Sequence, residues 1–253
     1  MRIPPPPRLF LIGMFAFASA SLAQVGSPMS KPFFFQQAKP VWPRGRETEK
    51  NLSVGFRCTF DGEFFVDNVT RGKDGKLTVT RNRSEVCQYF AFCFGLATPA
   101  THGRLWERLR DQFGPERGKT KAFPEIHPAN AFIGNYLRLE LLSRYDRPDQ
   151  ALDEMRGFFR HMVARTGTLW ENMDERASCN HGFASHVAWA LVRDSLGIAE
   201  IDTVHRVIHL KEPARKLAWS RARLPVPGGF LLLERQGDQT QITPPAGWHP
   251  VER

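Results

Sequence analysis

The spacing of apolar residues changes twice along the chain, and each change predicts a different secondary structure. Residues 51–60, 63–69 and 76–80 alternate apolar and polar positions, as short half-buried strands do. The sequence "GKDGK" between the last two favours a hairpin turn. Apolar positions follow the helical period from residue 84 and alternate again beyond Ile201. The predicted order is therefore β, then α, then β.

Helices are predicted throughout the middle of the chain, because apolar residues recur there every three or four positions. Serine or proline stands near several of the expected first turns. The connections are short, so neighbouring helices should form antiparallel hairpins. The predicted helices span residues 84–97, 103–113, 128–145, 148–165 and 181–196. Regularly spaced turn signals after them predict a small antiparallel β-sandwich.

The first residues of the chain have the pattern of a secretory signal. Arg2 and Arg8 precede an apolar run at 9–18, and small residues ending in "SLA" precede Gln24. The run is too short for an ordinary membrane span, and an uncleaved anchor is the alternative. We therefore expect a cleaved signal at residues 1–23, a periplasmic or secreted protein, and no stable membrane span.

Composition and charge narrow the classes of function. Hydrophobic residues make up 42% of the chain and aromatic residues 11%, which is typical of a folded protein with a substantial core. The formal net charge is +9, but basic residues are interleaved with acids, as in "RLWERLRDQF". Binding of nucleic acid is therefore not expected, because the sequence contains no long run of basic residues without acids.

Cysteines and histidines give no sign of a metal or a redox site. His181 and His186 are five residues apart, which does not place two ligands on one face of a helix. We expect neither a metal site nor a cofactor. The cysteines form no CxxC pair, which favours buried thiols. They are Cys58, Cys87, Cys93 and Cys179.

A group of polar and aromatic residues stands between the last two predicted helices. It contains Trp170, Glu171, Asn180 and His181 within "TGTLWENMDERASCNHGFAS". Glycoside hydrolysis requires carboxyl groups beside the scissile bond, and sugars pack their apolar faces on flat aromatic rings. These residue types suit both tasks, so the segment is a candidate sugar site.

Ordinary structural roles remain open for the same residues. A tryptophan at the end of a helix commonly belongs to the core, and an Asn-His pair commonly caps a helix. Glu171 could cap a helix or form an ion pair with Arg165 or Arg176. On this interpretation the segment is a loop without chemistry.

Several stretches of the chain resemble one known family. They are "SEVCQYFAFCFGLATP", "EIHPANAFIGNYLRLELLSR", "TGTLWE", "SCNHGFASH" and "ITPPAGW". In this order they are similar to successive parts of the bacterial α-L-rhamnosidases, six-hairpin glycosidases of the glycoside hydrolase family 78 type. The resemblance implies a multi-domain α and β protein: a short N-terminal β segment, a partial (α/α)6 toroid and a C-terminal antiparallel β-sandwich. The implied boundaries are residues 1–23 for the signal, 24–83 for the β remnant, 84–198 for the catalytic helices and 199–253 for the sandwich.

The resemblance also implies roles for single residues. Glu171, in "TLWE", matches the general base that activates water in this inverting family. Trp170 and His181 match positions that line the sugar subsite, and Asn180 holds the turn. The expected partner is therefore a rhamnose-containing glycan. Two further residues are candidates either for the pocket or for satisfying a helix terminus: Asn130 and Asn135.

The resemblance breaks where the family carries its general acid. That segment, a pattern similar to "DCPQRE", is absent from the sequence, and residues 61–65 join parts that are far apart in the family. We therefore expect a large internal deletion, natural or introduced by gene prediction. Half a toroid would expose apolar helix faces, which favours self-association. Other carboxyls could replace the acid: Glu85, Glu125 and Asp174.

The functional expectation follows from the resemblance and from the missing general-acid segment. It is an exported inverting α-L-rhamnosidase that hydrolyses terminal α-L-rhamnosides, with Glu171 as the general base. The alternatives are a catalytically inactive carbohydrate-binding remnant of such an enzyme and a truncated product without function.

Overall fold

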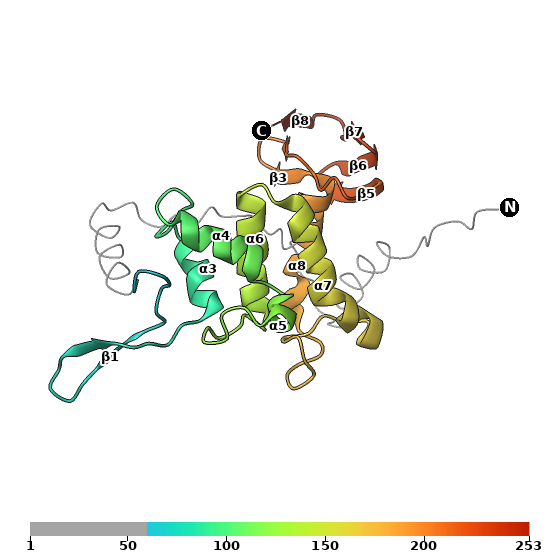
Figure 1. The fold of residues 1–253 in the computed structure, drawn as a ribbon. Helices are drawn as coiled ribbons and strands as arrows, with labels where there is room; N and C mark the ends of the chain where they lie inside the picture. The colour runs from blue at the N-terminus through green and yellow to red at the C-terminus, as the bar shows by residue number, and fades with distance from the viewer. Residues whose placement is uncertain (1–59, 253) are drawn as a thin grey trace, which may run out of the picture. The chain divides into compact units, whose positions relative to one another are not determined.

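A computed structural model of the chain describes residues 60–252 (Figure 1). The signal expected at 1–23 and nearly all of the strand expected at 51–60 lie outside these residues. The described part begins with a hairpin of β1 (Val69–Arg71) and β2 (Leu77–Val79). Its turn is closed by the Gly72 N–H, which donates to the Lys76 carbonyl at 2.8 Å, so the "GKDGK" turn is confirmed.

The strand expected at 63–69 is wrong for most of its length. Phe64 and Phe65 are buried in the helical core, and regular pairing starts only at Val69. The amide of Gln88 accepts from the Phe65 N–H at 2.8 Å and donates to the Phe65 carbonyl at 2.9 Å. A side chain therefore occupies the backbone groups that a neighbouring strand would need.

Helices fill the middle of the chain, as the apolar period predicts. Ser84 caps the first of them, because its hydroxyl accepts from the Cys87 N–H at 3.2 Å. The last long helix ends at Gly167, whose φ of +71° a residue with a side chain rarely adopts. The helices are α3 (Glu85–Cys93), α4 (Gly103–Gln112), α5 (Arg117–Thr120), α6 (Phe132–Arg144) and α7 (Pro148–Thr166).

Two of the predicted helices differ from the structure in their details. The helix expected at 128–145 starts only at Phe132, because Ala131 pairs with Asn172 in an extended bridge. The helix expected at 181–196 consists of three successive turns of different pitch. They are the 3₁₀ turn η1 (Gly182–Ser185), the α-helix α8 (His186–Ala190) and the π turn η2 (Leu191–Ser195).

Two buried ion pairs lie among the helices. Arg117 binds Glu85 at 2.7 Å, and Arg138 binds Glu154 at 2.8 Å. The guanidinium of Arg138 also donates to the backbone carbonyls of Leu109, Arg110 and Phe113. These bonds tie α6 to α7 and to the C-terminal end of α4, because Glu154 lies on α7 and the three carbonyls lie in or directly after α4.

The C-terminal part consists of two small sheets. One has the order β3-β4-β8 and the other β5-β6-β7. Side chains from both sheets share one apolar cluster, including Ile198, Ile208, Leu231 and Trp248, which confirms a sandwich. The strands are β3 (Ile198–Asp202), β4 (Val207–Leu210), β5 (Trp219–Val226), β6 (Gly229–Gln236), β7 (Gln239–Thr243) and β8 (His249–Glu252).

The sandwich is not wholly antiparallel, contrary to the prediction. β8 pairs with β4 in parallel, from Val207 opposite His249 to Leu210 opposite Glu252. The last strand was not predicted, since it is short and fully exposed and so lacks an alternating pattern. Among residues 60–252, no helix has the length and apolarity needed to cross a membrane.

Candidate functional site

The segment after α7 is held in place by backbone hydrogen bonds on both sides. On one side the Glu171 N–H donates to the Ser178 carbonyl at 2.8 Å. On the other side the Phe132 N–H donates to the Glu171 carbonyl at 2.8 Å. Glu171 is therefore fixed between the N-terminus of α6 and the loop that leads to η1.

Trp170 and Glu171 are neighbours in the sequence but differ in exposure. The Trp170 indole is only 1% exposed and packs edge-on against His161, with ring centres 5.5 Å apart. Its Nε1–H donates to the Thr166 hydroxyl at 2.7 Å. Trp170 is thus a core residue and offers no open face to a sugar, so the expected sugar-stacking role is corrected.

The Glu171 carboxylate faces solvent, with 39% of its side chain exposed. Its nearest charged or titratable partner is His181, whose Nδ1 lies 3.8 Å from Oε2. Arg165 and Arg176 do not neutralise it, because they bind Glu175 at 2.7 Å and Asp174 at 2.6 Å. The ion-pair alternative for Glu171 is therefore wrong.

Aromatic rings surround His181 and form a surface beside Glu171. The His181 ring lies 4.6 Å from the Phe132 ring and 5.6 Å from the Phe183 ring. Phe132 and Phe183 are stacked, and Phe183 is 75% exposed. We call Phe132, His181 and Phe183 the aromatic surface. The sequence analysis missed its two phenylalanines, although Phe183 stands within the quoted "SCNHGFASH".

The three asparagines differ in their positions. Asn180 is exposed, and its N–H lies 3.4 Å from the Ser178 hydroxyl. Asn130 meets the Glu171 segment through its backbone carbonyl, which accepts from the Met173 N–H at 2.9 Å. Both therefore belong to the frame that holds Glu171 in place.

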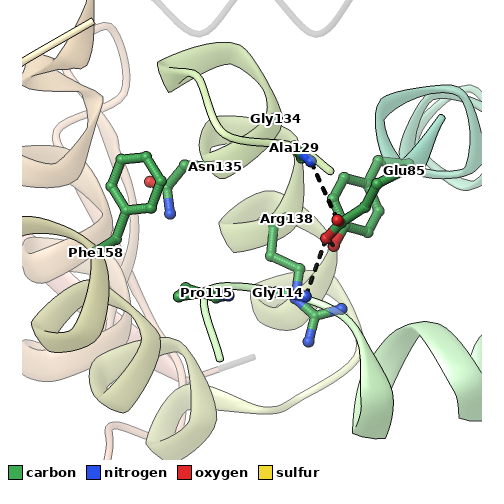
Figure 2. Close-up of a pocket in the computed structure, with 9 residues that line it drawn as sticks. Glu85, Gly114, Pro115, Ala129, Gly134, Asn135, Arg138 and Phe158 are labelled. Carbon is green, nitrogen blue, oxygen red and sulfur yellow. Dashed lines mark hydrogen bonds between the residues drawn. The ribbon is translucent and has the colours of Figure 1, made fainter. Parts of the chain in front are cut away.

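Asn135 lies in a different environment. Its side chain is 3% exposed, and its Oδ1 lies 3.0 Å from His186 Nε2. It lines a cavity of about 10 Å³ together with Glu85, Arg138 and Phe158 (Figure 2). That volume matches about one water molecule and is too small for a sugar ring. Asn135 is therefore not placed to contact a saccharide in this cavity.

Two of the carboxyls that could replace the missing acid are unsuited to the role. Glu85 is buried and accepts from Tyr89, Arg117 and the backbone N–H groups of Gly114 and Ala129, two of which Figure 2 shows. A general acid must carry a proton near the working pH. Hydrogen bonds from the Arg176 side chain and backbone lower the pKa of Asp174, so it stays ionised.

The described cysteines are free thiols. They are partly buried, and burial raises the pKa of Cys87 to about 12 and that of Cys93 to about 11. Cys179 is free as well, whereas Cys58 lies outside the described residues. Within residues 60–252, no group of three or more His, Cys, Asp or Glu side chains could hold a metal ion.

Comparison with known proteins gives a match of fold to a solved structure. No described protein family and no curated protein matches the sequence. Among solved structures, the fold is similar to a GH78 family rhamnosidase of Bacillus sp. GL1, with a TM-score of 0.60 and 17% sequence identity. The match covers 80% of this chain and 23% of that chain. The resemblance to the rhamnosidases is therefore confirmed as a likeness of fold, and the chain spans about a quarter of the length of that protein.

Proposed function

We propose that the chain carries the general-base side of an α-L-rhamnosidase site, with Glu171 as the base. The observation that supports this most directly is the state of its carboxylate. It is solvent-exposed, has no arginine partner among residues 60–252, and is fixed through the backbone of Glu171 beside the aromatic surface. On this proposal, helices α3 to α8 correspond to part of the six-hairpin toroid of the rhamnosidases.

The chemistry follows from the inverting mechanism. A water molecule lies between the Glu171 carboxylate and the anomeric carbon, and the carboxylate takes its proton as the oxygen attacks. The bond to the leaving oxygen breaks on the opposite face of the ring, where an acid normally supplies a proton. The exposed Phe183 ring gives the apolar face of a rhamnose a partner to pack on.

The acid side determines which substrates the chain can cleave by itself. Glu85 is enclosed by hydrogen bonds and Asp174 is held ionised. Glu125 is exposed, and no hydrogen bond or ion pair within residues 60–252 holds it opposite Glu171. We therefore propose that the chain hydrolyses rhamnosides whose leaving group departs as a stable anion. Alkyl rhamnosides need protonation of the leaving oxygen and stay intact.

Two substrates and two variants test this proposal. The chain should release dinitrophenolate from dinitrophenyl α-L-rhamnoside but no methanol from methyl α-L-rhamnoside. Glu171→Gln should lower the first rate about a hundredfold to ten-thousandfold, because it removes the base. Glu175→Gln is the matched control, since Glu175 is exposed and bound to Arg165. Equal rates in wild type and Glu171→Gln would exclude Glu171 as the base.

A carbohydrate-binding remnant is the second candidate, and the unsuitability of Glu85 and Asp174 as acids favours it. It predicts saturable binding of rhamnose by calorimetry, weakened in Phe183→Ala, with no turnover of either substrate. Binding without turnover would support the remnant over the hydrolase. The absence of both would support the third alternative, a product without function.

Export to the periplasm or the medium is also part of the proposal. It rests on residues 1–23, which lie outside the described part of the chain. Mass spectrometry of the protein from a bacterial periplasm should find a mature chain that begins near Gln24. Recovery of the full-length chain from the cytoplasm alone would contradict it.

A further inference from the structure

The outer face of the sheet β5-β6-β7 is a surface that the Glu171 site does not use. Exposed residues of β5 and β6 alternate with buried or half-buried ones, so one face of this sheet packs in the sandwich and the other meets solvent. The outward residues include a tryptophan, two arginines and several amides. Those that bear on ligand binding are Trp219, Arg221, Arg223, Glu234, Gln236 and Gln239.

One end of this face combines an aromatic ring with neutral amides. Trp219 is 59% exposed, although a tryptophan of a small sandwich normally packs in the core. The strand register places Gln236 directly opposite Trp219, and Gln239 directly opposite Gln236 on the third strand. A flat indole beside amide donors and acceptors suits the apolar face and the hydroxyl groups of a sugar ring.

The other end of the face carries a cation that is held in a fixed orientation. The Arg223 guanidinium carbon lies 3.6 Å from the centre of the Phe230 ring. Such stacking fixes the guanidinium plane and leaves its N–H edges free. Arg223 has no carboxylate partner within residues 60–252, whereas Arg221 binds Glu234 at 2.9 Å. The free N–H groups of the guanidinium can donate two parallel hydrogen bonds to a carboxylate.

We propose that the outer face of β5-β6-β7 binds a glycan chain that bears carboxylate groups, at a site separate from Glu171. Trp219 packs against a neutral face of one sugar, and Arg223 binds the carboxylate of another sugar in the same chain. The two stand four positions apart on β5, which is about 13 Å. An oligosaccharide can span this distance, so the proposed ligand is an acidic oligosaccharide rather than a single sugar.

A second copy of the chain fits this face less well. A symmetric dimer would set the same face against itself and bring Arg223 toward the other copy. The acidic residue of the face, Glu234, is already bound to Arg221. An unpaired cation buried at such an interface weakens association. The charge of the face therefore favours an anionic ligand.

Calorimetry on the full chain tests the proposal, with oligogalacturonate as the acidic glycan and a neutral xylo-oligosaccharide of equal length as its control. We expect saturable binding of the oligogalacturonate and at least about tenfold weaker binding of the neutral chain. Trp219→Ala and Arg223→Gln should each weaken binding about tenfold, as anchor residues of an interface do. Arg215→Gln is the matched control, because Arg215 is exposed and bound to Glu212.

Several outcomes would overturn the proposal. One is the absence of oligogalacturonate binding, and another is binding that Trp219→Ala leaves unchanged. Equal binding of dextran sulfate would indicate unspecific attraction of any polyanion. A dimer in sedimentation that Trp219→Ala dissociates would assign the face to a second copy. Because the assay needs no rhamnoside and no Glu171, its result is independent of the proposed hydrolase.

Discussion

At the scale of single residues, the direction of a side chain decides its role more than its type does. Trp170 and Glu171 are neighbours in "TLWE", yet the indole is buried in the core and the carboxylate is exposed. The sequence analysis could identify both residue types but not the side each faces, because that depends on hydrogen bonds to Phe132 and Ser178. In the proposed site the aromatic partner of a rhamnose is therefore Phe183 rather than Trp170.

Substituting each of these two aromatic residues separately should distinguish an effect on stability from an effect on binding. Trp170→Phe should lower the free energy of unfolding by about 1–3 kcal/mol, because it leaves a cavity and removes the bond to Thr166. Phe183→Ala should change it by no more than about 0.5 kcal/mol, since that ring is exposed, while it weakens binding of rhamnose. Urea unfolding and calorimetry measure the two effects. The reverse pattern would place Trp170 in the binding site.

His186 should make stability depend on pH. Burial, aided by nearby Arg193, lowers the pKa of His186 from about 6.5 to about 4, against the opposing effect of the Phe183 carbonyl. The unfolded chain therefore binds a proton first as the pH falls, and the folded state loses about 3 kcal/mol between pH 6.5 and pH 4. His186→Gln keeps a polar partner for Asn135 but does not titrate, so its loss over this range should be smaller. Equal pH profiles in urea unfolding would contradict this.

At the scale of helices and strands, the sequence predicted most of the elements but not the contacts between them. Helices α3, α4, α6 and α7 lie where the apolar period placed them. The misses are physical in origin: Gln88 occupies the backbone of Phe65, and Ala131 pairs with Asn172 across a long sequence distance. The local spacing of apolar residues carries no information about partners that are distant in the sequence. The candidate site was missed in part for the same reason, since Phe132 and Phe183 meet only in the fold.

The buried pair of Arg138 and Glu154 should be the most sensitive point among the helices. Arg138→Met should lower the free energy of unfolding by about 3–5 kcal/mol. It removes the cation that pairs with Glu154, whose side chain is only 11% exposed, and leaves Gln150 as the donor that remains. Adding Glu154→Met should restore part of this loss. The restoration should be incomplete, since the carbonyls of Leu109 and Phe113 still lack a donor. Urea unfolding of the single and the double variant measures both changes. A double variant with the stability of the wild type would show that the hydrogen bonds to the carbonyls contribute little.

At the scale of the whole described region, a small polar junction joins the helices to the sandwich. The Lys211 ammonium donates to the Ser143 carbonyl at 3.1 Å and binds the buried Asp194 at 3.2 Å. Gly197 lies at the same place, where a Cβ would stand 2.5 Å from the Lys211 carbonyl oxygen. Close packing and a satisfied buried charge at one point favour cooperative unfolding of residues on both sides, because neither part can leave without exposing Asp194.

Self-association should involve the exposed apolar residues near the aromatic surface. Ile133, Tyr136 and Phe183 keep large parts of their side chains in solvent, as a partial toroid would require. We expect the average mass in sedimentation to rise with protein concentration. Phe183→Ser should reduce the rise, whereas Leu77→Ser on the β1–β2 hairpin should not, although Leu77 is also exposed. Because Phe183 is also the proposed partner of rhamnose, added rhamnose should reduce association in the same way. A monomer at all concentrations, or equal effects of both variants, would show that this surface holds no second copy.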